Sequence, residues 1–188
     1  HGTPAGAFNI RKNGAALARQ STTEIEISTK TDKPGINITV APGTINKSVH
    51  IPVILTEGGL QDLVYNTFDI GAGSDVLIVA GCGIHNDSNQ KSRHDGIHEF
   101  FIRRDAKIRY IEKHYGQGGG TGERILNPVT IIHLEEGATA ELELVQIRGI
   151  DNTERSTEIH AGSKARLLMN ERLLTHENQK ALSGIIVH

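Results

Sequence analysis

Apolar and polar residues alternate along most of this chain, in short stretches that glycine, aspartate or proline interrupts. In five places an alternating stretch is followed by a tight turn and then by a second alternating stretch. Alternation with a period of two residues is typical of β-strands that bury one face, so each place predicts a strand, a turn and a strand. The five segments are residues 36–45, 68–79, 98–110, 130–142 and 157–169.

These segments form a degenerate repeat. When each is aligned on the small residue that follows its turn, successive positions are separated by 30, 32, 32 and 27 residues. Stacked strand–turn–strand units of this length, with no convincing helix between them, predict an all-β fold, a parallel β-helix or related solenoid. A β-sandwich is the alternative that the pattern leaves open. The aligned residues are Thr44, Ser74, Ala106, Ala138 and Ala165.

Two segments near the C-terminal end complete the prediction. Residues 161–174 have helical propensity, but the phase of the repeat and the Gly162-Ser163 pair predict a turn followed by a strand. Residues 184–187 begin a further strand where the sequence stops. We therefore expect one domain over residues 1–188 that is truncated at its C-terminus.

The composition excludes several classes of protein. Lys and Arg number 20 against 22 Asp and Glu, and this balance argues against a general nucleic-acid binder. No apolar run is long enough to span a bilayer, so no membrane association is expected. Cys82 is the single cysteine, so an intramolecular disulfide is impossible and a reducing, cytoplasmic setting is expected.

The phase of the repeat predicts an unusual row of interior side chains. Cys82, His114 and Gln146 each lie eight residues after an aligned position, so they should lie above one another on successive turns and face inward. Glu112 and Glu171 fall on the same face, two residues earlier in their units. A buried polar row is costly unless it is paired. The row is therefore either a hydrogen-bonded ladder that closes the core or a path for a sulfur species or a metal.

Residues 81–98 are the densest polar stretch and hold a second candidate site. His85, His94 and His98, together with Cys82, are residue types that bind zinc or iron. Their spacing fits no zinc-finger signature, so a polar connecting loop with solvent-facing histidines is the alternative. The glycine-rich residues 116–122 lack the ending of a phosphate-binding loop and predict a surface hairpin or crossover.

Six short motifs of the chain are LIVAGCGIH at 77–85, DGIHEF at 95–100, IRYIEKHYG at 108–116, ILNPVT at 125–130, VQIRG at 145–149 and NERLLT at 170–175. Together they resemble the core domain of the SufB/SufD family, scaffolds of iron–sulfur cluster assembly, and they look closest to the compact SufB-like proteins of anaerobes and archaea. The N-terminal GAFNIRKNG at residues 6–14 resembles that branch more loosely.

The resemblance implies a right-handed parallel β-helix that pairs with a second SufB/SufD-like subunit and with a SufC-type ATPase. A cysteine desulfurase or sulfur carrier would supply the sulfur, and the iron–sulfur cluster would be assembled transiently. Cys82 matches a cysteine thought to accept or pass sulfur, while His114 and Gln146 match inner-wall positions of the family. The family continues beyond Val187 into a region that holds the ATPase contact and proposed cluster ligands. No residue here points to a flavin.

The leading hypothesis is therefore a scaffold component of iron–sulfur assembly that is not an enzyme by itself. Sulfur would pass from Cys82 along Glu112, His114 and Gln146, and this requires an accessible thiolate of low pKa. One alternative is a metal-dependent β-fold enzyme that uses His85, His94 and His98. Another is a purely structural solenoid that binds other proteins.

Overall fold

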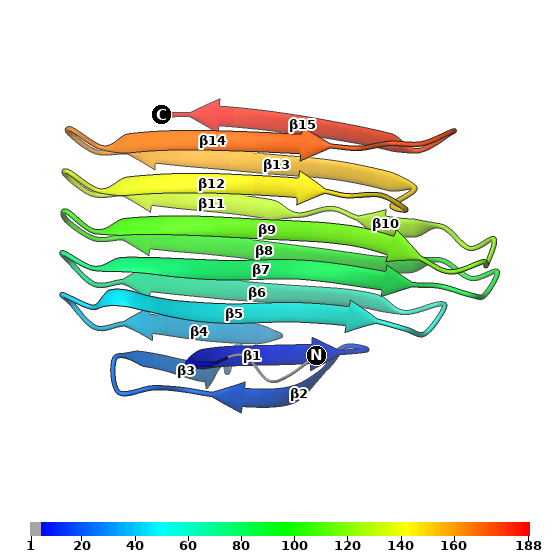
Figure 1. Cartoon of the computed structure of the whole chain (residues 1–188), viewed down its shortest axis with the longest axis horizontal. Coiled ribbons are helices and arrows are strands. Elements are labelled where there is room, and N and C mark those ends of the chain that lie inside the picture. The colour runs from blue at the N-terminus through cyan, green and yellow to red at the C-terminus, as the bar shows by residue number, and fades with distance from the viewer. Residues whose placement is uncertain (1–4) are drawn as a thin grey trace.

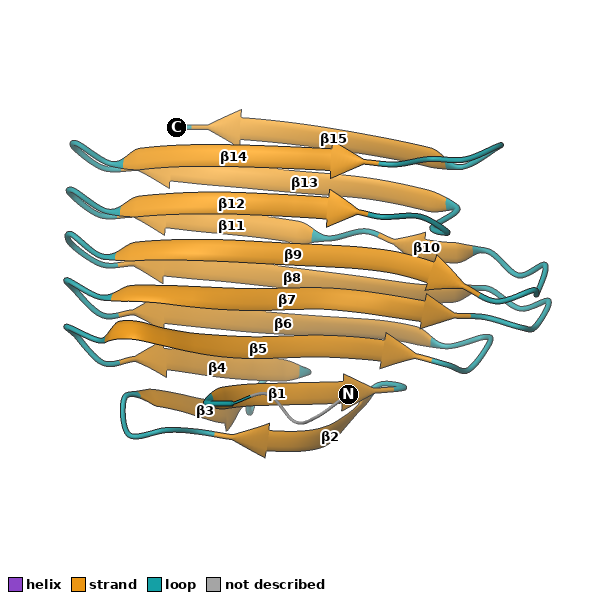
Figure 2. Ribbon diagram, in the orientation of Figure 1, coloured by secondary structure: helices purple, strands orange, loops and turns teal. Residues whose placement is uncertain are grey.

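The protein is a parallel β-solenoid of about five turns, seen in a computed structural model that describes residues 5–188. From β4 onward the chain passes alternately between two sheets, with β10 and β11 both in the same sheet, so each turn contributes to both sheets (Figure 1). The described residues contain strands, turns and loops but no helix (Figure 2), and therefore none that could cross a bilayer. The all-β solenoid predicted from the repeat is confirmed, and the β-sandwich alternative is wrong.

Sheet A has the strand order β14-β12-β9-β7-β5-β1-β2, and sheet B has the order β10-β13-β11-β8-β6-β4-β3 with β15 paired to β13. The strands of sheet A are β1 (Ala7–Lys12), β2 (Ala15–Gln20), β5 (Ile45–Leu55), β7 (Asp75–His85), β9 (Lys107–Gln117), β12 (Thr139–Gln146) and β14 (Arg166–Leu173). The strands of sheet B are β3 (Ile25–Thr29), β4 (Gly35–Val40), β6 (Gln61–Ile70), β8 (Ser92–Ile102), β10 (Arg124–Leu126), β11 (Val129–Leu134), β13 (Asn152–Ala161) and β15 (Lys180–Val187).

The first strands close the N-terminal end of the solenoid. All other strand pairs are parallel, but β1 pairs with β2 and β3 pairs with β4 in the antiparallel direction. In Figure 1, β1, β2 and β3 lie below the stacked turns, and β4 belongs to the first of those turns. An antiparallel return covers the edge of the first full turn, where an uncovered strand would offer free backbone groups to another chain.

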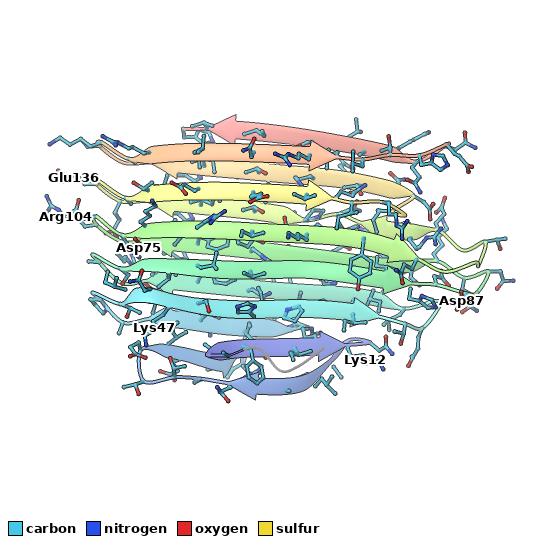
Figure 3. All side chains as sticks on the ribbon, viewed as in Figure 1. Lys12, Lys47, Asp75, Asp87, Arg104 and Glu136 are labelled. Carbon is cyan, nitrogen blue, oxygen red and sulfur yellow. The ribbon has the colours of Figure 1, made fainter. Side chains whose placement is uncertain are left out.

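A stack of tight turns sets the repeat. At one end of the solenoid, each turn has one residue with positive φ just before the aligned small residue: Gly43, Gly73, Asp105, Gly137 and Lys164, with φ between 55° and 72°. Glycine and aspartate adopt this left-handed conformation at low cost, and this explains the glycine or aspartate in the sequence pattern. Figure 3 shows Arg104 and Glu136 at this end, and their side chains form an ion pair at 3.1 Å.

The interior has two apolar parts. The larger part fills the half nearest those turns and includes Phe68, Phe100 and Ile132. The smaller part, near the opposite end, includes Leu55, Ile84, Leu126 and Ile150. The inward residues of the final strand of sheet A, β14, are only half-buried. Between the two apolar parts lie polar side chains from both sheets, described next.

Candidate functional site

The predicted row of inward side chains is present. In sheet A, Cys82 of β7 is in register with His114 of β9, and His114 is in register with Gln146 of β12. All three are buried, with at most 3% of each residue exposed. The strand alternation therefore placed them correctly, because parallel strands in register stack equivalent side chains above one another.

Glu112 is the charged centre of this group. It lies two residues before His114 on the same face of β9, and its pair partner on the next strand is Leu144, which in turn pairs with Glu171. Its Oε2 accepts a hydrogen bond of 2.6 Å from Nη1 of Arg155, which reaches across the interior from β13. Both side chains are almost fully buried.

The ion pair fixes the charge of Glu112. Burial alone would raise the pKa of this carboxyl, but the Arg155 guanidinium and the His114 imidazole outweigh burial and hold its pKa well below the usual value. Burial lowers the pKa of Arg155, and the Glu112 carboxylate more than offsets this effect. The pair is therefore a carboxylate and a guanidinium, both charged, inside the solenoid.

His114 lacks the hydrogen bonds that a buried imidazole usually makes. Its Nε2 lies 3.1 Å from Oε1 of Glu112 but is not aligned for a hydrogen bond, and neither ring nitrogen has a hydrogen-bond partner among residues 5–188. Burial lowers the pKa of His114, against the raising effect of Glu112, so the ring is neutral at neutral pH. One ring nitrogen of His114 is therefore available as a base or a ligand.

Sheet B contributes a second polar column. Asn66, His98, Thr130 and Thr157 are in register on β6, β8, β11 and β13, and all four are buried. His98 Nδ1 lies 2.8 Å from the hydroxyl of Tyr110, which belongs to the facing sheet. Burial lowers the pKa of His98 to about 4, and it raises the pKa of Tyr110 well above its usual value. His98 is therefore a neutral imidazole at neutral pH.

A third group anchors His94. Its Nδ1 lies 3.0 Å from Oδ2 of Asp62, and Oδ1 of Asp62 accepts a hydrogen bond of 2.9 Å from Arg11. Burial raises the pKa of Asp62, but His94 and Arg11 together lower it below the usual value. A carboxylate on Nδ1 fixes the orientation of the ring and leaves Nε2 to face the interior.

A small cavity of about 10 Å³ joins these groups. Its lining includes His94, His98, Glu112, His114 and Gly96. Gly96 lies between the two histidines on the inward face of β8, and a Cβ built on it would be 3.2 Å from Nε2 of each. A space of this size holds about one water molecule or ion.

The predicted metal group is only partly brought together. His94 and His98 both point inward from β8. His85 lies at the end of β7 with its side chain 45% exposed, and its Nε2 is 2.6 Å from Oδ2 of Asp87. Figure 3 shows Asp87 at the end of the solenoid opposite Arg104 and Glu136. The wall of the solenoid therefore separates the His85 side chain from the other two histidines, because neighbouring residues on a strand face opposite sides.

Cys82 is not an accessible thiolate in this structure. Burial raises the pKa of its thiol far above the usual value, and the negative charges of Asp62 and Glu112 raise it further. The thiol is therefore protonated at neutral pH and shielded from solvent. The low-pKa thiolate that sulfur acceptance requires is absent from this closed conformation.

Sequence reasoning missed three partners of these groups. Arg155, Asp62 and Asn66 were not identified as site residues, although each shares strand parity with apolar inward residues such as Ile159 or Phe68. Extending the alternation backward from these apolar positions would have placed all three inside. Asp62 and Asn66 are the register partners of His94 and His98 within sheet B. Only the meeting of Arg155 with Glu112 depends on how the two sheets face each other.

A separate polar group lies on the outer face of sheet B. The rings of Phe101, His133, His160 and His188 stack in sequence with centroids 4.7–5.0 Å apart. Potential ligand atoms of Glu158, His160 and His188 all lie within 4.8 Å of one another, the one such group of three among residues 5–188. This group is partly exposed and was not predicted.

Comparison of the chain with protein-family models, curated proteins and solved structures finds no match.

Proposed function

We propose that the chain is a scaffold component of SUF-type iron–sulfur cluster assembly, with Cys82 as the sulfur acceptor and no enzymatic activity of its own. The sequence motifs at residues 77–85, 95–100 and 108–116 support this proposal. The solenoid agrees with the β-helix that the resemblance implies, but a fold hosts many functions. The polar side chains inside the solenoid therefore carry the proposal.

The observation that carries the proposal is a lone thiol next to paired polar groups inside an otherwise apolar solenoid. Cys82 is in register with His114, and Glu112 beside His114 is ion-paired to Arg155. A buried ion pair contributes little net stability and is often less favourable than apolar packing. The presence of this ion pair near the single cysteine favours a role for these residues in a chemical reaction.

The transfer that we propose is persulfide exchange. Cys82 loses its proton, and its sulfur attacks the outer sulfur of a donor persulfide. The sulfur–sulfur bond of the donor breaks, the donor leaves as a thiolate and takes up a proton, and Cys82 becomes a persulfide. Neutral His114, the neighbour of Cys82 in the row, is the base for the first proton. Gln146 and Glu112 line the continuation of the path.

The closed solenoid holds Cys82 protonated, so this transfer needs a conformation that admits the donor. In SUF-type assembly the resemblance assigns such a rearrangement to ATP hydrolysis by a SufC-type partner acting on a pair of SufB/SufD-like subunits. The donor would be a cysteine desulfurase or a sulfur carrier, and iron would be cargo that joins the sulfur. In the cell, this cluster assembly would take place in the cytoplasm.

The test is an anaerobic assembly reaction that contains the full chain, a SufC-type ATPase, a second SufB/SufD-like subunit, a desulfurase, cysteine, ATP and ferrous iron. We expect mass spectrometry to find one added sulfur atom on Cys82 and the Cys82→Ser variant to give a much lower yield of acid-labile sulfide. Val53→Ala is the control, since Val53 is the register partner of Cys82 on β5 and the variant keeps the thiol. An unmodified Cys82 with an undiminished cluster yield in Cys82→Ser would contradict the proposal and favour a structural solenoid.

A further inference from the structure

The cavity beside Gly96 has the features of a binding site for a single ion. Its volume of about 10 Å³ is too small for an organic ligand. Gly96 lines it, and alanine at this position would place a carbon 3.2 Å from Nε2 of both His94 and His98. The backbone of β8 therefore directs two imidazole nitrogens at one point.

Polar contacts to Nδ1 orient the side chains of His94 and His98, an arrangement that is usual for metal-binding histidines. Asp62 accepts from Nδ1 of His94 at 3.0 Å, and Arg11 in turn holds Asp62. The Tyr110 hydroxyl lies 2.8 Å from Nδ1 of His98, and Nδ2 of Asn66 lies 3.5 Å from its Nε2, a long contact that a bound ion would replace. A carboxylate or other oxygen on one ring nitrogen fixes the tautomer and orients the other toward a ligand.

The facing sheet supplies two further donors at the same cavity. His114 lines it, is almost fully buried and has no hydrogen bond on either ring nitrogen among residues 5–188. Glu112 lines it as well, and Arg155 occupies only its Oε2. An unpartnered imidazole in a low-dielectric interior carries an unrecovered desolvation cost. A ligand that bound His114 and Oε1 of Glu112 would remove this cost.

We propose that this cavity binds one divalent transition-metal ion, with His94, His98, His114 and Glu112 as its ligands. Imidazole nitrogens with one carboxylate oxygen suit zinc or ferrous iron and are a poor set for calcium or magnesium. The four donor atoms are farther apart than in a bound site, since the one tight group of three within the described chain is Glu158, His160 and His188. Binding therefore draws the interior side chains together. This proposal does not rest on the proposed role in sulfur transfer, and it describes a different state of the interior, because a bound ion would occupy the His114 nitrogen that the transfer uses as a base.

The experiment is a titration of the chelator-treated full chain with cobalt(II), followed by absorption spectroscopy and by the shift in melting temperature. We expect one equivalent to bind, to produce the visible bands of a four- or five-coordinate nitrogen and oxygen site, and to raise the melting temperature. Gly96→Ala keeps every proposed ligand but fills the cavity, so it should fold and lose the bands. His94→Ala and His114→Ala should lose them as well.

Two controls separate this site from its rivals. His160→Ala removes the surface group, and Cys82→Ser removes the thiol but leaves all four proposed ligands. Both variants should retain the cobalt bands at one equivalent. Bands that survive in a folded Gly96→Ala variant, bands lost in His160→Ala, or a wild-type chain that binds no cobalt would each overturn the proposal. Because Cys82→Ser keeps the metal but loses sulfur transfer, failure of either proposal can be recognised separately.

Discussion

Arg155 and Glu112 face each other across the interior of the solenoid, with Nη1 of the arginine 2.6 Å from Oε2 of the glutamate. They come from opposite sheets, β13 and β9, and both side chains are almost fully buried. This pair connects the two sheets beside the cavity that His94, His98 and His114 line. The polar layer therefore crosses the whole width of the fold.

Breaking this pair by removing one partner should be strongly destabilising. Arg155→Met leaves the buried Glu112 carboxylate without its arginine, and Glu112→Leu leaves the buried Arg155 with only Glu171, at 3.5 Å. We expect each to lower the free energy of unfolding by about 3–5 kcal/mol in urea titrations. The double variant should lose much less than the sum of the two. Arg109→Met is the control, because its ion pair with Glu143 is exposed and should contribute under about 1 kcal/mol. Additive losses in the double variant would show that the two side chains are not coupled.

The stability of the metal-free protein should fall in mild acid. Burial lowers the pKa of His98 from 6.5 to about 4, so the unfolded chain binds a proton on this residue at a pH where the folded protein does not. The stabilisation is complete above pH 6.5 and is lost as the pH falls toward about 4. The size of this loss is about 3 kcal/mol, and His114, whose pKa is also lowered, adds to it.

Chemical unfolding at a series of pH values in the presence of a chelator measures this loss. His98→Asn removes the main titrating group and should flatten the profile between about pH 6.5 and 4 relative to wild type. His160→Asn, on the partly exposed outer face, is the matched control against which the His98→Asn profile is compared. A wild-type stability that does not change over this range would show that His98 is not buried as a neutral ring.

The Cys82 thiol should be almost unreactive until the protein unfolds. It is buried, and burial together with Asp62 and Glu112 raises its pKa. We expect reaction with an aromatic disulfide reagent at about pH 8 to be at least about a hundredfold slower in the folded protein than in urea, because only the exposed thiolate reacts. Equal rates in the two states would contradict the closed interior. Acceleration by a SufC-type ATPase with ATP would support the opening that the proposed sulfur delivery requires.

The stacked turns should tolerate alanine poorly at their left-handed positions. Gly73 has a φ of +68° and open space where a Cβ would be, so Gly73→Ala introduces backbone strain without a clash. The expected loss in the free energy of unfolding is roughly 1 kcal/mol. Gly119→Ala, in a loop with equally open space and no positive φ, should be close to neutral. Equal effects at the two positions would mean that the turn conformation does not set the stability of the repeat.

The solenoid was predictable because its repeat is local. A glycine or aspartate in each turn, a small residue after it and alternation beyond it specify one coil at a time, as at Gly73, Ser74 and Val76. The row of Cys82, His114 and Gln146 followed from the same count, because in-register parallel strands place equivalent residues of successive turns directly above one another. The resemblance to iron–sulfur scaffolds remains a prediction that the fold alone does not test.

The sequence by itself determined which side chains of each strand face inward, because alternation on a strand has a fixed period of two. Only the tertiary structure decided which inward side chains meet across the interior. Arg155 pairs with Glu112, and Tyr110 contacts His98, because the two sheets face each other. No local sequence pattern encodes how the sheets are placed. Strand parity places Cys82 and His85 on opposite faces of β7, which the prediction of a metal group containing His85, His94 and His98 overlooked. Only the closed interior makes the Cys82 thiol inert.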